Sequence, residues 1–192
     1  MERRELLDVC DTSRYTDGEF DAVVAFGGPL SYSFERTDEA MSGLLRVIRP
    51  DGLVVASVMS LLGTWRHFLP AITTLSDVGD DANDRALGTG DLRHVVSDTG
   101  EHICRMFRWS DVEALVRHTG GRIVDGSASN WASLGDPEVL ARLEADPARW
   151  ERFIEHEIAA CAEPGARDGA THILFASQRA AVHRLRAGMA SS

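Results

Sequence analysis

The residues whose types could do chemistry are dispersed along this sequence of 192 residues. Seven histidines are spread through it, and His102 with Cys104 gives two possible metal ligands without the second pair that a zinc site needs. The Gly-Xaa-Ser-Xaa-Gly pattern of a hydrolase nucleophile is absent, and Gly27-Gly28 is too short to form a loop that cradles phosphate. We therefore predict no metal site and find no familiar catalytic motif.

Two polar segments contain aspartate. Asp11-Thr12-Ser13 has the composition of a turn and follows the apolar stretch at residues 6–10. Residues 76–93 carry several aspartates among glycines, but they lack the closing bidentate carboxylate and the ligand register of a calcium loop. We predict a solvated, mobile loop there.

Composition limits the function classes. The formal net charge is -10, and all 20 basic residues are arginine, so neither nucleic acid nor an anionic membrane is expected as a partner. Cys10, Cys104 and Cys161 are odd in number and widely spaced, which favours reduced core thiols in a cytoplasmic protein. No stretch approaches the length of a membrane span, and the N-terminus lacks the apolar core of a signal peptide.

Residues 20–57 are the segment around which the other elements are arranged. FDAVVAFGG and LVVASV are apolar and β-branched, and between them lies TDEAMSGLLRVIR, an amphipathic helix that Pro50-Asp51-Gly52 ends. Thr37 is the expected N-cap of this helix. A strand, a helix and a second strand of these lengths predict a parallel crossover, and hence an α/β sheet.

The remaining elements follow from similar signals. Strands are expected near residues 5–10, 20–26, 53–58, 122–128 and 171–177, and a short helix within residues 64–74. Ser110 and Glu113 form a capping box, while Asp136-Pro137 and Asp146-Pro147 each predict a helix start. We expect one domain over residues 1–179, followed by a frayed or disordered tail at 180–192.

Three segments in this order resemble the class I S-adenosylmethionine-dependent methyltransferases: DTSRYTDGEFDAVVAFGGPLSY, LLRVIRPDGLVVASV and RMFRWSDVEALVRHTGGRIVDGSASN. The resemblance runs from about residue 5 to residue 179. It implies a Rossmann-like α/β sheet, mostly parallel with an antiparallel last strand, and S-adenosylmethionine as the cofactor. It also implies methyl transfer to an O, N or C nucleophile of a small-molecule acceptor.

The resemblance assigns cofactor-binding roles. Asp11 corresponds to the acidic residue that accepts a hydrogen bond from the adenine amino group, and Thr12 beside it offers a backbone amide. Asp11 could instead only cap a turn. Ala25, Phe26 and Gly27 match positions that line the methionine part of the cofactor, at the carboxyl end of a strand where ligands of open α/β sheets bind. Phe26 could equally be a packing residue, and Gly27 a turn glycine.

Acceptor-side residues are less defined. Tyr32 follows the cofactor segment and could orient a nucleophile, although a buried tyrosine at a helix entrance is the alternative. Trp65 and His67 belong to an irregular insert at residues 61–108 that could form a lid over the pocket, although single histidines are usually surface or core residues. No catalytic residue is assigned, because methyl transfer relies mainly on positioning.

The sequence departs from the family in one respect. Complete members carry a Gly-rich first strand and an acidic second strand, which hold the carboxylate and ribose of the cofactor, and this sequence has neither. Residues 22–26 should then form an open sheet edge, or pair with residues 6–10. Two hypotheses follow: a truncated methyltransferase, or a non-catalytic subunit that forms a homodimer or pairs with a partner strand at that edge.

Overall fold

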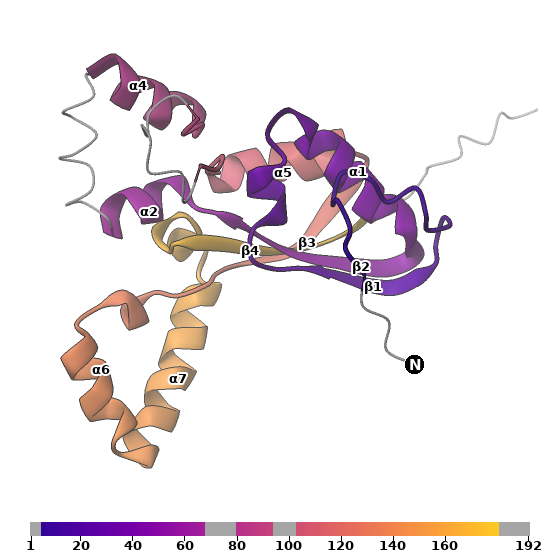
Figure 1. Cartoon of the computed structure of the whole chain (residues 1–192). Coiled ribbons are helices and arrows are strands. Elements are labelled where there is room, and N and C mark those ends of the chain that lie inside the picture. The colour runs from indigo at the N-terminus through magenta and orange to yellow at the C-terminus, as the bar shows by residue number, and fades with distance from the viewer. Residues whose placement is uncertain (1–4, 68–79, 94–102, 181–192) are drawn as a thin grey trace, which may run out of the picture.

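The computed structural model describes residues 5–67, 80–93 and 103–180, which form a four-stranded sheet with helices (Figure 1). The sheet has the order β1-β2-β4-β3, with β1 at Phe20–Ala25, β2 at Ile48–Met59, β3 at Gly121–Ala128 and β4 at His172–Arg179. β1 and β2 are parallel, and β4 runs antiparallel to both β2 and β3. This confirms the predicted α/β sheet, in which only the last strand is reversed.

The crossover from β1 to β2 forms as predicted. Its helix, α1 (Thr37–Val47), carries Asp38 and Glu39 in its first turn, where carboxylates favour the positive end of the helix dipole. The helix ends two residues earlier than expected, and the Pro50-Asp51-Gly52 segment lies inside β2 rather than before it. The pairing register between β1 and β2 shifts at this point, since Phe20 pairs with Ile48 but Ala22 pairs with Leu53. This irregularity accommodates the extra residues of β2.

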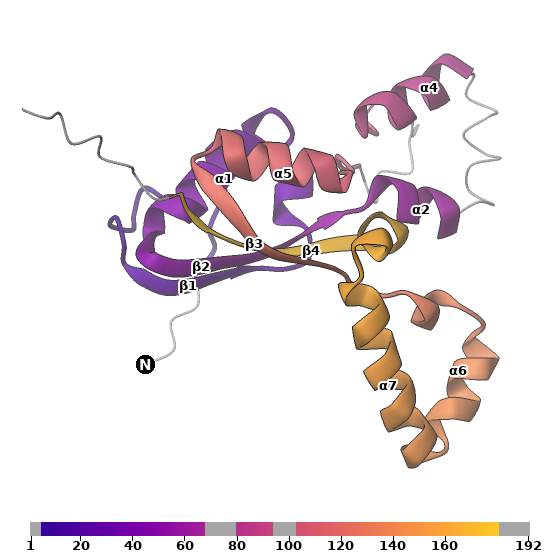
Figure 2. The same ribbon diagram turned by 180° about the vertical axis from the view of Figure 1, so that it is seen from behind.

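One face of the sheet is covered by α1 and α5 (Trp109–His118), which lie side by side in both views (Figures 1 and 2). Alternate residues of each strand point toward these helices, as the two-residue period of a strand requires. The core between them contains Ala25, Leu44, Leu45, Met41, Val54, Ala56, Val58, Val112, Val116, Ile173 and Phe175.

The opposite face is less covered. Val24 of β1 is 64% exposed, and Val124 of β3 is 45% exposed. Because β1 has β2 as its one neighbour in the described sheet, it forms a lateral edge. The predicted open edge at residues 22–26 is therefore present.

Further elements follow the carboxyl ends of the strands. Two 3-10 turns, η1 (Pro29–Tyr32) and η2 (Phe34–Arg36), come after β1, and α2 (Leu61–His67) and α4 (Asp80–Thr89) come after β2. After β3 and η3 (Ala132–Leu134), α6 (Pro137–Glu144) and α7 (Pro147–Ala162) form a hairpin that extends away from the sheet, and η4 (Pro164–Gly169) leads back to β4 (Figure 2). Asp136 and Asp146 cap α6 and α7 as predicted.

The predicted strand at residues 5–10 is wrong. The backbone amide of Cys10 donates to the Asp8 carboxylate at 2.9 Å, and the amide of Asp11 donates to the Asp8 carbonyl at 2.9 Å, so the chain turns instead of extending. Leu6 is fully exposed and Leu7 is 41% exposed, so neither gains the burial that would favour a strand.

Two predicted helix starts are also wrong. Arg36, not Thr37, is the N-cap residue of α1, because η2 runs directly into the helix and the Thr37 hydroxyl donates to the Phe34 carbonyl at 2.6 Å. The helix α5 begins at Trp109, so Ser110 lies inside it. The N-cap residue is Arg108, whose backbone amide donates to the Asp111 carboxylate at 2.8 Å, and the Trp109 amide donates to the Asp168 carboxylate at 2.7 Å.

The prediction of a polar loop at residues 76–93 is wrong for most of the part that the structure describes, residues 80–93. Residues 80–89 form α4, although that helix lacks a continuous apolar stripe. The helix expected within residues 64–74 corresponds to α2, which ends at His67. The rest of that prediction, residues 68–74, lies outside the described residues, as do His102 and nearly all of the predicted tail.

All three cysteines are free and buried, as the sequence indicated. Burial, followed by the nearby Asp91 charge, raises the pKa of the Cys104 thiol to about 11, so this thiol is a packing residue and not a nucleophile at neutral pH. In the described part of the chain, no helix is long and apolar enough to cross a membrane.

Candidate functional site

The carboxyl ends of β1, β2 and β3 lie at the same end of the sheet, because these strands point the same way. The chain leaves β1 through Phe26 and two glycines, Gly27 and Gly28, whose φ angles are 82° and 74°. This left-handed conformation is readily available only to glycine. A side chain built on Gly27 would meet no atom within 4 Å, so open space lies beside this turn.

Ser31 fixes the segment after this turn. Its hydroxyl is buried and accepts a hydrogen bond from the Met59 amide at 2.9 Å, at the end of β2. Its carbonyl accepts from the Arg105 amide at 2.8 Å. The ends of β1 and β2 are thereby tied together, which gives the turn at Gly27 and Gly28 a rigid base.

Asp11 and Thr12 lie against α1. With Cys10 and Ser13 they line an open depression of about 500 Å³ against α1, whose lining is completed by Glu39, Ser42, Gly43 and Arg46. Cys10 and Ala25 belong to the same buried core, so the segment of Asp11 and the end of β1 are held by one packed cluster. Ala25, Phe26 and Gly27 do not line the depression itself.

Asp11 is exposed and forms a turn with Ser13, whose backbone amide donates to the carboxylate at 3.1 Å. The Ser13 hydroxyl and amide lower the pKa of Asp11, and the guanidinium groups of Arg36 and Arg14 act in the same direction. The carboxylate is therefore ionised at neutral pH and can accept further hydrogen bonds. Thr12 beside it is buried.

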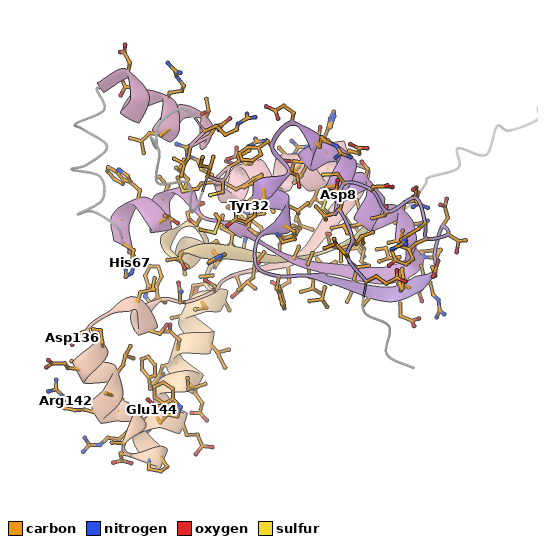
Figure 3. All side chains as sticks on the ribbon, viewed as in Figure 1. Asp8, Tyr32, His67, Asp136, Arg142 and Glu144 are labelled. Atoms are coloured by element: carbon orange, nitrogen blue, oxygen red, sulfur yellow. The ribbon has the colours of Figure 1, made fainter. Side chains whose placement is uncertain are left out.

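The remaining predicted site residues are spread out. Ala25 is buried at the end of β1, whereas Phe26 is 54% exposed and Tyr32 is 46% exposed. The alternative of a buried tyrosine is thus wrong. Trp65 is 41% exposed on α2, and His67 is exposed at the end of that helix. Figure 3 shows Asp8, Tyr32 and His67 at separate positions along the molecule, so His67 is not beside Tyr32.

The neighbours of Trp65 on α2 make contacts with distant segments. The Arg66 guanidinium stacks over the Trp131 ring at 5.2 Å from its centroid and donates to the Gly169 carbonyl at 2.7 Å. Arg167 stacks over Trp109 at 4.4 Å. The contacts of Arg66 join α2 to Trp131, just before η3, and to Gly169 at the end of η4, whereas the Arg167–Trp109 pair joins η4 to α5.

Comparisons with protein-family models and with curated proteins find no match. Among solved structures, an S-adenosylmethionine-dependent methyltransferase from Methanosarcina mazei matches with a TM-score of 0.52 and 12% identity, over 92% of this chain and 66% of that one. A possible histamine N-methyltransferase from Thermotoga maritima matches with a TM-score of 0.50 and 10% identity, over 89% of this chain and 61% of that one. The [4+2]-cyclase SpnF matches with a TM-score of 0.46 and 15% identity, over 92% of this chain and 55% of its own length.

The chain has the S-adenosylmethionine-dependent methyltransferase fold. It spans less than two thirds of the length of each of these three structures. The order β1-β2-β4-β3 with a reversed β4 therefore belongs to a methyltransferase-type sheet, as the sequence resemblance implied.

Sequence reasoning missed three residues around this candidate site. Arg36 and Arg46 hold the segment that carries Asp11, but their partners lie 26 to 34 residues away, so no local pattern indicates them. His172 begins β4 opposite Met59, at the same end of the sheet as Gly27. Burial lowers the pKa of His172, so the ring is neutral at pH 7.

Proposed function

We propose that this chain binds S-adenosylmethionine and acts in transferring its methyl group to an O, N or C nucleophile of a small-molecule acceptor. The main support is the methyltransferase fold combined with an ionised aspartate, Asp11, that lines a depression against α1. Because one fold hosts many functions, the site residues carry as much of this proposal as the fold does.

The described residues fit part of the cofactor. A depression of about 500 Å³ is large enough for an adenine ring, and the Asp11 carboxylate can accept a hydrogen bond from its amino group. The open space beside Gly27 suits the methionine end. Among the described residues, we assign none to the ribose hydroxyls or to the cofactor's carboxylate.

Positioning is the chemistry that these residues would supply. The bound cofactor brings an activated methyl group on a sulfonium, so the protein needs mainly to align the acceptor and exclude water. Asp11 and Thr12 would orient the adenine, Ala25, Phe26 and Gly27 would flank the methionine part, and Tyr32, Trp65 and His67 would face the acceptor. No proton transfer is required unless the acceptor must lose a proton early.

Calorimetric titration with S-adenosylmethionine tests the proposal. We expect micromolar binding to the wild-type chain and at least tenfold weaker binding to Asp11→Asn, because the asparagine can still accept from the Ser13 amide but loses the charge. Asp84→Ala, at an exposed aspartate of α4, is the matched control and should bind like the wild type. Absence of binding to the wild-type chain would refute cofactor binding by these residues.

A second candidate function is a non-catalytic subunit that pairs with a partner strand or a second copy. One observation favours it: β1 is an edge strand in which Val24 is 64% exposed. Stable dimerisation without any binding of S-adenosylmethionine would support this function, and micromolar cofactor binding would exclude it.

A further inference from the structure

Cys10 and Thr12 lie on either side of Asp11 in the sequence. The backbone carbonyl of each accepts a hydrogen bond from an arginine of the α1 region. Arg36, the N-cap residue of α1, donates from Nη2 to the Cys10 carbonyl at 3.3 Å. Arg46, in the last turn of α1, donates from Nη2 to the Thr12 carbonyl at 2.7 Å. The backbone on each side of Asp11 is thus bound to α1, near its start through Arg36 and near its end through Arg46.

Arg46 makes the larger set of contacts. Besides the Thr12 carbonyl, its Nη1 donates to the Tyr15 carbonyl at 2.9 Å and to the Asp17 carboxylate at 2.6 Å. Its Nη2 also lies 3.3 Å from the Thr12 hydroxyl. A planar guanidinium can serve several acceptors in fixed directions, and the single ammonium of a lysine cannot reproduce this geometry. One side chain therefore sets the path of residues 12–17.

The surface of α1 is shaped to receive this segment. A Cβ atom on Gly43 would lie 2.7 Å from the Thr12 hydroxyl oxygen, closer than real Cβ atoms approach a neighbour. Gly43 stands one turn before Arg46 in the helix, and both line the depression beside Asp11. The absence of a side chain at Gly43 lets Thr12 lie directly on α1.

We infer that Arg46, assisted by Arg36 and by the bare helix surface at Gly43, is a positioning residue that presents Asp11 to the adenine amino group of the cofactor. This inference rests on the proposed cofactor binding. Each arginine donates to the backbone beside Asp11 and acts on the ligand through it. Ordering the segment before the ligand arrives lowers the conformational entropy lost on binding.

The test compares S-adenosylhomocysteine with S-inosylhomocysteine, which carries a carbonyl in place of the adenine amino group. A site that pairs with the amino group rejects the inosine analogue, because the Asp11 carboxylate then meets an acceptor. We expect the wild type to prefer the adenosine ligand at least tenfold. In Arg46→Met this preference should fall at least fivefold, with partial recovery in Arg46→Lys, while Arg142→Met, at an exposed arginine of α6, keeps the wild-type ratio.

Gly43→Ala separates positioning from folding. Alanine favours a helix interior over glycine, which offsets part of the cost of moving Thr12, so this variant should melt close to the wild-type temperature while it displaces Thr12 and reduces the preference for the adenosine ligand. An unchanged preference in both Arg46→Met and Gly43→Ala would overturn the inference.

Failure of the proposed function gives a different result. If the wild type binds neither ligand, cofactor binding is refuted, and amide hydrogen exchange of residues 8–18 then tests whether Arg46 orders this segment. Faster exchange there in Arg46→Met than in Arg142→Met would retain Arg46 as the residue that orders this segment. Equal exchange would remove that role as well.

Discussion

Ser177 is a core-facing residue of the central strand β4, and its hydroxyl has no hydrogen-bond partner among the described residues. A buried hydroxyl without a partner loses its hydration and gains nothing in return. We expect Ser177→Ala to stabilise the protein by about 1 kcal/mol, which would raise the melting temperature by roughly 2–4 °C. Thermal unfolding followed by circular dichroism measures this change.

The control for that prediction is Ser127 on the neighbouring strand β3. Its hydroxyl donates to the Cys161 carbonyl at 3.1 Å, so Ser127→Ala should lower the melting temperature. If both alanine variants shift the melting temperature in the same direction, the hydroxyl of Ser177 is not the cause of its effect.

Glu157 on α7 joins the hairpin to the loop after β3. Partial burial raises the pKa of this carboxyl, but hydrogen bonds from the Ser133 hydroxyl and from the amides of Trp131, Ser133 and Ala132 outweigh it, so the net pKa is lowered. A lowered pKa stabilises the folded state above the unfolded-state pKa of about 4.3, and this stabilisation is lost as the pH falls through the folded-state value.

We therefore expect the Glu157→Gln variant to be less stable than the wild type at pH 7, with the difference shrinking as the pH falls below about 4. Urea unfolding at pH 7 and pH 3.5 measures the two differences. Glu155→Gln, at an exposed glutamate on the same helix, is the control and should change little at either pH. A difference that stays constant with pH would contradict the role of the ionised carboxylate.

The turn at Asp11 could be predicted from the sequence, but the arginines that bind it could not. Asp11 stands after a short apolar stretch in a turn-forming sequence, and the structure has that turn. The sequence does not indicate the arginines that bind this turn. An arginine on a helix surface gives the same sequence pattern whether its guanidinium faces solvent or a carbonyl more than 20 residues away. The role of Asp11 toward adenine stays a prediction.

At the scale of elements, α2 packs against η4 through a glycine. A Cβ atom on Gly63 would lie 1.7 Å from the Ala170 carbonyl oxygen, so Gly63→Ala must push α2 away from η4. We expect a loss of roughly 1–3 kcal/mol or more in the free energy of unfolding, because backbone cannot yield as a flexible side chain does. Chemical denaturation measures the loss.

Gly88 in α4 provides the matched helical control. No atom lies within 4 Å of a Cβ atom built there, so Gly88→Ala should be neutral or stabilise by up to about 1 kcal/mol. Equal destabilisation by both substitutions would show that helix propensity, and not the contact with Ala170, governs the result.

Elements with strong periodicity were predictable, and those set by distant contacts were not. The strands β1 to β4 and the helix α1 follow from apolar patterns in their own residues. By contrast, α4 has little apolar patterning, and the first amide of α5 donates to Asp168, which lies 59 residues from Trp109. Residues 6–10 have a strand-like composition, but the Asp8 turn prevents an extended conformation.

At the scale of the molecule, the β1 edge is the exposed side of the sheet. Val24 in this strand is 64% exposed, and edge strands of this kind pair with other chains. We expect the isolated protein to associate as its concentration rises, and Val24→Lys to reduce this association. Sedimentation velocity over a range of concentrations measures both.

Val139→Lys is the control, because Val139 is 42% exposed on α6 and lies away from the sheet edge. The expectation is that this variant associates like the wild type. Equal association of the wild type and Val24→Lys would show that the β1 edge is not the contact.

The strand order has a consequence for how the chain folds during synthesis. β3 pairs with β4 in the described sheet, and β4 is made last, after the α6–α7 hairpin. While the ribosome is still adding residues 129–171, β1, α1 and β2 can assemble, but β3 has no strand to join. The nascent chain must therefore keep β3 unpaired until the final strand emerges, and a ribosome that stalls before His172 would hold an incomplete sheet.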